Sequence, residues 1–166
     1  MAYELKYITE FEVGQKGTFT KTITDADVLM FGAVSGDLNP VHFDHEYAKT
    51  TMFGRNIAHG GICVGLLSAA GAQFTGQGSI FVKCEYFFAA PVYIGDTVTA
   101  TMEIADINYE KKNMHFHAYC KNQDGVTVLD GKATVKALKG PYSMIDLGIV
   151  QYHFEIGANR PIERES

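Results

Sequence analysis

The chain has 166 residues, of which 46% are hydrophobic and 20% are charged, and its formal net charge is −5. This balance is typical of a globular domain with one core and excludes a disordered chain. Proteins that bind nucleic acids usually carry a basic surface that neutralises phosphates, so the negative charge argues against that class.

Three widely spaced cysteines form no Cys-x-x-Cys pair, which argues against both a zinc site and a disulfide framework. We therefore expect reduced thiols in the core at Cys63, Cys84 and Cys120. The first residues show no basic region followed by an apolar run, so we expect no signal peptide and a cytoplasmic location.

The first third of the chain predicts one strand followed by short helices. Residues 16–23 are rich in Thr and favour a strand. Thr24-Asp-Ala-Asp27 is typical of a helix start, because Thr accepts from first-turn amides and acids suit the positive end of the helix dipole. This helix should end at Gly36, and a second is expected over about 45–51. The apolar face predicted for the first helix, which starts at Thr24, consists of Leu29, Met30, Ala33 and Val34.

Residues 57–74 are almost entirely apolar or small, which predicts a helix buried on nearly all sides. His59 and Gln73 interrupt the run and argue against a membrane span. Gly61, Gly65 and Gly71 each cost such a helix about 1 kcal/mol relative to Ala. That cost is explained if the helix lies close against a sheet.

From residue 78 onward the hydrophobic period is two, which predicts strands over 80–88, 97–107, 113–121 and 126–138. Asp124-Gly125 is a typical hairpin turn before the last of them. Together the elements predict an α+β fold, in which a curved antiparallel meander wraps around the long apolar helix. We expect one domain over residues 1–139 and an extension over 140–166 that packs on the domain or on a subunit interface.

Two short motifs carry the chemistry. Ser35-Gly-Asp-Leu-Asn-Pro-Val-His42 sets the Asp37 carboxylate and the His42 imidazole five residues apart, on a loop stiffened by Asn39 and its proline. About 20 residues later the long helix opens at His59-Gly60-Gly61 with free backbone amides that can hold a negative oxygen. A proton-transferring pair beside an oxyanion site is suited to adding water to a polarised double bond, or removing it.

The first motif resembles the hydratase motif of the MaoC-like (R)-specific enoyl-CoA hydratases. His59-Gly60, the helix that carries Ser68, Gly78-Ser-Ile and Pro91-Val-Tyr-Ile-Gly-Asp96 match the same family in order, over about residues 10–138. The resemblance implies a hot-dog fold, a homodimer or dimer of dimers, and reversible syn hydration of trans-2-enoyl-CoA to (R)-3-hydroxyacyl-CoA. The C-terminal extension is absent from short family members.

Carried over by position, the resemblance implies that Asp37 and His42 activate the water and that the Gly60 amide polarises the thioester carbonyl. Asn39 and Ser68 would support the pair. The implied partner is an acyl-CoA thioester, with acyl-carrier protein as a possible carrier, and neither nucleic acid nor membrane. No cofactor is expected.

Other histidines receive structural interpretations. His42, Asp44 and His45 are close in sequence, but His45 would point away in an extended loop, so we expect no metal site. His115 and His117 should lie on the outer face of a half-exposed strand. His59 is expected to cap its helix or to pack at the pocket mouth.

Two other functions compete with hydration. A hot-dog thioesterase would direct water at the thioester carbonyl, but such enzymes generally place an acid on the long helix, and residues 61–74 contain no Asp or Glu. A non-catalytic acyl-thioester-binding subunit, or the inactive partner in a heteromeric dehydratase, should lack the acid–imidazole pair that this chain has.

Overall fold

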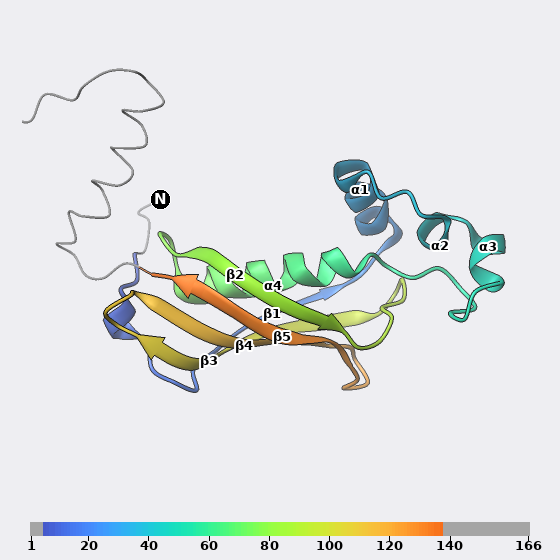
Figure 1. Ribbon diagram of the computed structural model, residues 1–166. Coiled ribbons are helices and arrows are strands. Elements are labelled where there is room, and N and C mark those ends of the chain that lie inside the picture. The colour runs from blue at the N-terminus through green and yellow to red at the C-terminus, as the bar shows by residue number, and fades with distance from the viewer. Residues whose placement is uncertain (1–4, 138–166) are drawn as a thin grey trace, which may run out of the picture.

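One long helix, α4 (Gly60–Thr75), lies across an antiparallel sheet, and three shorter helices extend beyond one end of that sheet (Figure 1). The computed structural model describes residues 5–137, so the predicted extension over 140–166 lies outside the described residues. The other elements, in chain order, are η1 (Ile8–Glu10), β1 (Lys16–Thr22), α1 (Asp25–Ser35), α2 (Pro40–Phe43), α3 (His45–Lys49), β2 (Ile80–Phe88), β3 (Thr97–Asn108), β4 (Asn113–Lys121) and β5 (Thr127–Lys136).

The five strands have the spatial order β1-β3-β4-β5-β2. The predicted meander is confirmed for β3, β4 and β5, with a left-handed glycine at Gly125 in the last turn. It is wrong for β2, which pairs with β5 at the far edge rather than with β3. The segment after β2 does not lead directly into a hairpin with β3, because its backbone hydrogen-bonds to other parts of the chain. The Ala89 amide donates to the Val128 carbonyl, and the Val92 carbonyl accepts from the Ala58 amide.

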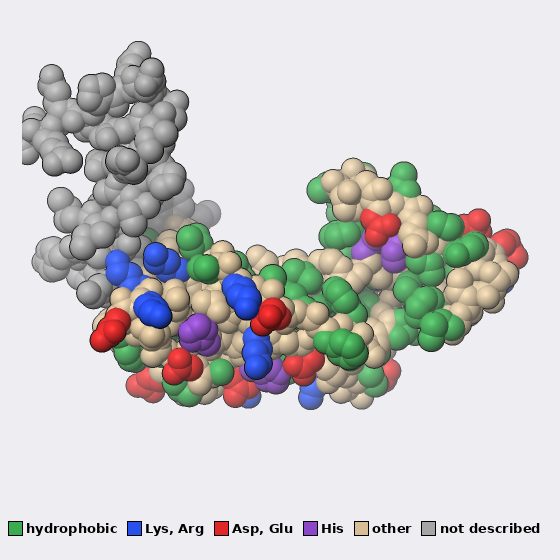
Figure 2. Space-filling view, in the orientation of Figure 1, with side chains coloured by type: hydrophobic (Ala, Val, Ile, Leu, Met, Phe, Trp, Pro, Cys, Tyr) green, Lys and Arg blue, Asp and Glu red, His purple; other side chains and the backbone are tan. Residues whose placement is uncertain are grey.

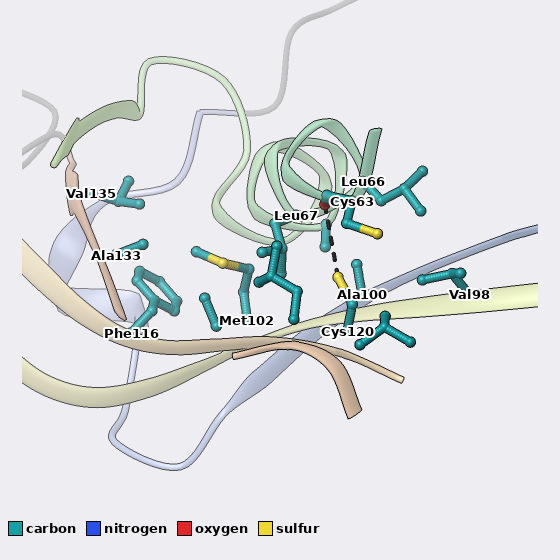
Figure 3. Packing of buried hydrophobic residues seen from close by; sticks show 14 of the residues in the cluster. Cys63, Leu66, Leu67, Val98, Ala100, Met102, Phe116, Cys120, Ala133 and Val135 are labelled. Atoms are coloured by element: carbon teal, nitrogen blue, oxygen red, sulfur yellow. Dashed lines mark hydrogen bonds between the residues drawn. The ribbon is translucent and has the colours of Figure 1, made fainter. Parts of the chain in front are cut away.

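The core lies between the inner face of the sheet and one face of α4. Figure 3 shows Leu67 of this helix directed toward the strands, and Cys63 and Leu66 belong to the same buried cluster. The facing strand residues, buried as predicted, include Val98, Ala100, Met102, Phe116 and Cys120. The opposite face of α4 is exposed at Gly65, Ser68 and Ala72, so the prediction of burial on nearly all sides is wrong for the single chain.

Helix α1 also departs from expectation. Its predicted start is confirmed, because the Thr24 side chain accepts from the Asp27 amide, and so is its predicted end at Gly36, which has a left-handed conformation. Its predicted apolar face is not buried, because α1 stands beyond the end of the sheet: Leu29 is 65% exposed and Val34 is 90% exposed. Cys84 is likewise exposed, because β2 is an edge strand, whereas Cys63 and Cys120 are buried as expected. Within residues 5–137 we find no helix with the length and apolar character that a membrane crossing requires.

Helix α4 and the sheet approach each other closely at Gly17 in β1. A Cβ on this residue would overlap the Cβ of Phe74 and lie 3.0 Å from the carbonyl oxygen of Ala70. Only the missing side chain allows α4 to pack against β1 at this distance.

We predict that Gly17→Ala lowers the free energy of unfolding by about 1–3 kcal/mol, because the helix or the strand must shift to admit one methyl group. The neighbouring exposed Thr18→Ala should change it by less than about 0.5 kcal/mol. Urea unfolding followed by circular dichroism measures both. Equal stability of the two variants would contradict this packing.

Candidate active site

The loop that carries Asp37 is shaped by its own side chains. The Ser35 hydroxyl accepts from the Asp37 amide at 3.1 Å, directly after α1 ends at the left-handed Gly36. One carboxylate oxygen of Asp37, Oδ1, accepts from the Asn39 amide at 3.2 Å. This local bond occupies Oδ1 and leaves Oδ2 directed toward His42.

Asn39 begins the short helix that carries His42. Its side-chain oxygen accepts from the Val41 amide at 3.1 Å, and Pro40 follows at the first helical position, where a missing N–H costs nothing. The structure therefore gives Asn39 a capping role, and its predicted supporting role toward the substrate stays a prediction.

The orientation of His42 is set by a backbone carbonyl. Its Nδ1 lies 2.8 Å from the oxygen of Ile57 and donates to it, because a carbonyl can only accept. In the neutral ring this leaves Nε2 as an acceptor, 3.9 Å from Asp37 Oδ2. The His42 side chain is 10% exposed, whereas that of Asp37 is 52% exposed, so the pair lies at the boundary of the protein interior.

The segment before α4 joins the short helices to the core. The buried Asn56 side chain donates to the Val41 carbonyl at 3.0 Å. Ile57 donates to the same carbonyl at 3.4 Å, and Ala58 donates to Val92 at 2.8 Å. Helix α2 is thereby tied to the segment between β2 and β3.

His59 connects the two predicted motifs. Its Nε2 lies 2.9 Å from the backbone oxygen of Asp37, and its ring stacks on that of His42 with a centroid separation of 3.7 Å. It makes no side-chain cap on α4, and it is buried and does not line the pocket that contains His42, so neither expectation for this residue describes its position. Sequence reasoning did not foresee the stacking, although the adjacent Gly-Gly marked the segment.

The N-terminus of α4 lies at a pocket. Gly60 is the first helical residue, so its amide has no partner within the helix. A Cβ at Gly60 would lie 2.5 Å from Cε1 of Phe88, and one at Gly61 would overlap the ring of Phe31. The two glycines are therefore required by close aromatic packing, and both line the pocket.

This pocket has a volume of about 530 Å³, which is within the range of small-molecule sites. His42 is its only imidazole among the described residues, and most of its wall is apolar. The wall comes from the segment before α4, the start of α4 and the segment after β2, with Met52, Phe53, Ile57, Ala58, Gly60, Gly61, Cys63, Phe88, Ala89, Ala90, Pro91, Val92 and Val128. Sequence reasoning did not assign the residues after β2 to the site, although Pro91 and Val92 belong to a segment that matched the family.

Geometrically, the pair can hold a water molecule. Two acceptors 3.9 Å apart can both lie at about 2.8 Å from one water oxygen, which then donates one hydrogen to each. The amide of Gly60 belongs to the same pocket as His42. The arrangement therefore combines a site for a polarised water with a donor for a negative oxygen.

Asp37, His42 and His59 also bring one potential metal ligand each within 4.8 Å of one another. The stacked rings are inclined by only 30°, so their in-plane lone pairs run nearly parallel. A cation must lie in the plane of each imidazole at about 2 Å, which this stacking prevents. His59 Nε2 is moreover engaged with a carbonyl.

Ser68 lies on the exposed face of α4, about 12 Å along the helix axis from Gly60. It does not line the pocket beside His42 in the single chain, and its predicted role stays a prediction. His115 and His117 lie on β4 as expected, where they hydrogen-bond to Thr134 and Asp130.

Cys63 forms part of the pocket wall and contacts the second buried thiol. The Cys120 thiol donates to the carbonyl of Cys63 at 3.7 Å (Figure 3). Its contact with Cys63, together with burial, raises the pKa of the Cys120 thiol, so this group stays protonated at neutral pH.

Solved structures with this architecture include the R-hydratase PhaJ1 from Pseudomonas aeruginosa in the unliganded form, with a TM-score of 0.76 and 38% identity over 81% of this chain and 86% of that one. The (R)-hydratase from Aeromonas caviae matches with a TM-score of 0.73 and 38% identity, over 76% of this chain and 97% of that one. The sheet wrapped around α4 is thus the predicted hot-dog fold, of class α+β.

A family model for the MaoC-like domain matches residues 10–124. The (R)-specific enoyl-CoA hydratase of Rhodospirillum rubrum is 41% identical over 132 residues, which are 79% of this chain and 91% of that protein. The 3-hydroxybutyryl-CoA dehydratase of Methylorubrum extorquens is 38% identical over 80% of this chain and 85% of that protein. The chain belongs to the MaoC-like domain family.

We predict that Asn39→Ala weakens α2 by about 0.5–2 kcal/mol, because the Val41 amide loses its cap, whereas Asn39→Asp keeps an acceptor and should change it little. Hydrogen exchange at the amides of α2 reports the local effect. Unchanged protection in Asn39→Ala would contradict the capping role.

Proposed function

We propose that the chain catalyses the reversible hydration of trans-2-enoyl-CoA to (R)-3-hydroxyacyl-CoA. The observation that carries this proposal is the 3.9 Å pair of Asp37 Oδ2 and His42 Nε2 beside the free amide end of α4. Relatives named as hydratases and dehydratases, at 38–41% identity over most of the chain, support the same reaction.

In this mechanism Asp37 and His42 hold and activate one water. The water oxygen forms a bond to Cβ of the enoyl thioester while its proton passes to the pair. The electrons of the double bond move toward the thioester oxygen, where the Gly60 amide stabilises the negative charge. A proton from the pair then reaches Cα, so that water has added across the double bond and the site regains its starting protonation.

The pocket supports an apolar acyl group as the part of the substrate beside the pair. Of the fourteen residues that line it, only His42 and Cys63 carry an ionisable side chain, and the other twelve carry none. Burial of an apolar chain there contributes about 0.8 kcal/mol per methylene group. Coenzyme A and acyl-carrier protein would both present such a chain through the same thioester.

We propose further that two copies associate through β2. The two sheet edges differ: β1 carries lysines and threonines, which discourage pairing, whereas β2 exposes a run of large apolar residues. Figure 2 shows hydrophobic side chains also gathered over the end that carries α1, α2 and α3. The exposed set includes Ile80, Phe81, Val82, Phe87 and Phe88 on β2, and Leu29, Met30, Val34 and Leu38 around α1. Pairing by β2 would yield the homodimer, or dimer of dimers, expected from the sequence.

A cytoplasmic location is part of the proposal. The three free thiols among residues 5–137 suit a reducing compartment. The net charge of −5 supports an enzyme for a small-molecule thioester rather than a partner of nucleic acid or of a membrane surface.

We predict that Asp37→Asn and His42→Ala each lower kcat for crotonyl-CoA by about 10²–10⁴-fold, because each removes one of the two groups that move the proton. Loss of the enoyl-thioester absorbance measures hydration. Asp25→Asn and His45→Ala are matched controls, since both residues are exposed on neighbouring helices.

Near-wild-type turnover in either variant of the pair would refute the roles of these residues. Release of a free thiol without formation of the hydroxyacyl thioester would indicate a thioesterase instead. Ser68→Ala should lower kcat less than the pair variants do.

We predict that light scattering gives at least twice the chain mass of 18.3 kDa, and that Val82→Asp shifts the protein toward the monomer by placing a charge on the β2 edge. Thr20→Asp, on the opposite edge at β1, should leave the mass unchanged. A monomeric wild type, or dissociation by Thr20→Asp alone, would rule out association through β2.

A further inference from the structure

We infer that His59 is a positioning residue for the proposed catalytic pair, because its single ring restrains both Asp37 and His42. The inference rests on the proposed function for its consequence in catalysis. Three independent observations carry it: a hydrogen bond, a ring stack and a buried nitrogen without a partner.

The hydrogen bond ties the loop of Asp37 to α4. His59 Nε2 lies 2.9 Å from the Asp37 carbonyl oxygen and donates to it across 22 positions of sequence. The other hydrogen bonds of Asp37 among the described residues are local, to Ser35 and Asn39. The carboxylate is half exposed, so local packing alone restrains it weakly, and the bond from His59 fixes the backbone from which it projects.

The ring stack restrains His42 in a different direction. The bond from His42 Nδ1 to Ile57 lies in the plane of the imidazole and fixes where Nε2 points. The His59 ring, 3.7 Å away and inclined by 30°, packs against the face of the His42 ring and fixes its tilt. The two contacts together restrain the ring in both directions, so Nε2 keeps its distance from Asp37.

A histidine at position 59 carries a free-energy cost, an unpaired buried nitrogen, that a residue with only a packing role would avoid. The side chain is 2% exposed and lies against Phe31 and Phe43, with centroid separations of 4.9 and 5.7 Å. In that surrounding its Nδ1 is buried with no hydrogen-bond partner. A phenyl ring would fill the same space without an unpaired nitrogen, but it could not donate to Asp37.

Two variants separate the two contacts. His59→Phe keeps a ring that can stack on His42 and removes the donor, whereas His59→Gln keeps an N–H near the place of Nε2 and removes the ring. Phe11→Leu is the matched control, because Phe11 is a buried aromatic residue that packs on Phe74, at the other end of α4. All proteins are assayed as full chains, and kcat is normalised to the folded fraction.

We expect each His59 variant to lower kcat by about 10–100-fold with KM changed by less than about threefold, because a small misplacement of reacting groups reduces turnover more than binding. The control should melt at a lower temperature but keep its kcat. Wild-type kcat in both His59 variants, with only the melting temperature lowered, would overturn the inference.

A second readout does not depend on the reaction. The nitrogen resonances of His42 report its tautomer and its hydrogen bond to Ile57, and they should shift in both His59 variants but not in Phe11→Leu. If the wild type fails to hydrate any enoyl thioester while these resonances shift, the proposed function fails and the positioning role stands. Unshifted resonances in both variants would overturn the positioning role whatever the activity.

Discussion

The hydrogen bond from His42 to the carbonyl of Ile57 joins the two halves of the molecule. On one side of it stand the short helices and the Asp37 loop, which lie beyond the end of the sheet. On the other side lie α4 and the strands, which the segment of Ile57 reaches through Ala58, whose amide donates to the Val92 carbonyl between β2 and β3. The same bond selects the tautomer that turns Nε2 toward Asp37. This one hydrogen bond therefore sets both the position of the proposed base and which of its ring nitrogens carries the proton.

Elements that follow from the local hydrophobic pattern were predictable from the sequence. The strand that each strand pairs with, and the surface that each apolar face packs on, were not. Strict alternation at Met114, Phe116, Ala118 and Cys120 placed β4 correctly, because side chains of a strand alternate between faces. The position of β2 beside β5 depends on the path of the segment 89–96, which no alternation encodes. The apolar residues of α1 and the outer face of α4 reflect surfaces that the single chain does not cover. A hydrophobic pattern indicates burial without saying by which chain.

The site divides in the same way. Asp37 and His42 are five residues apart, and a turn with Asn39 and Pro40 brings such groups together by local geometry alone, so the pair was accessible from the sequence. The stacking of His59 on His42 depends on two segments 17 residues apart meeting in space. Its only sequence signal was Gly60 and Gly61, whose missing side chains admit the rings of Phe88 and Phe31. Pro91 and Val92 of the pocket wall belong to a segment that matched the family, but nothing in that match assigned them to the site.

Phe88 belongs to two surfaces at once. Its ring closes over Gly60 as part of the pocket wall, and its backbone ends the strand at the uncovered edge of the sheet. A chain that pairs with this edge changes the freedom of the ring, and a ligand that fills the pocket changes the edge that such a chain would meet. If two copies pair through β2 as proposed, occupancy and association become linked equilibria, and by reciprocity each changes the other by the same factor. Under that proposal the apparent affinity of the pocket for its ligand would depend on protein concentration.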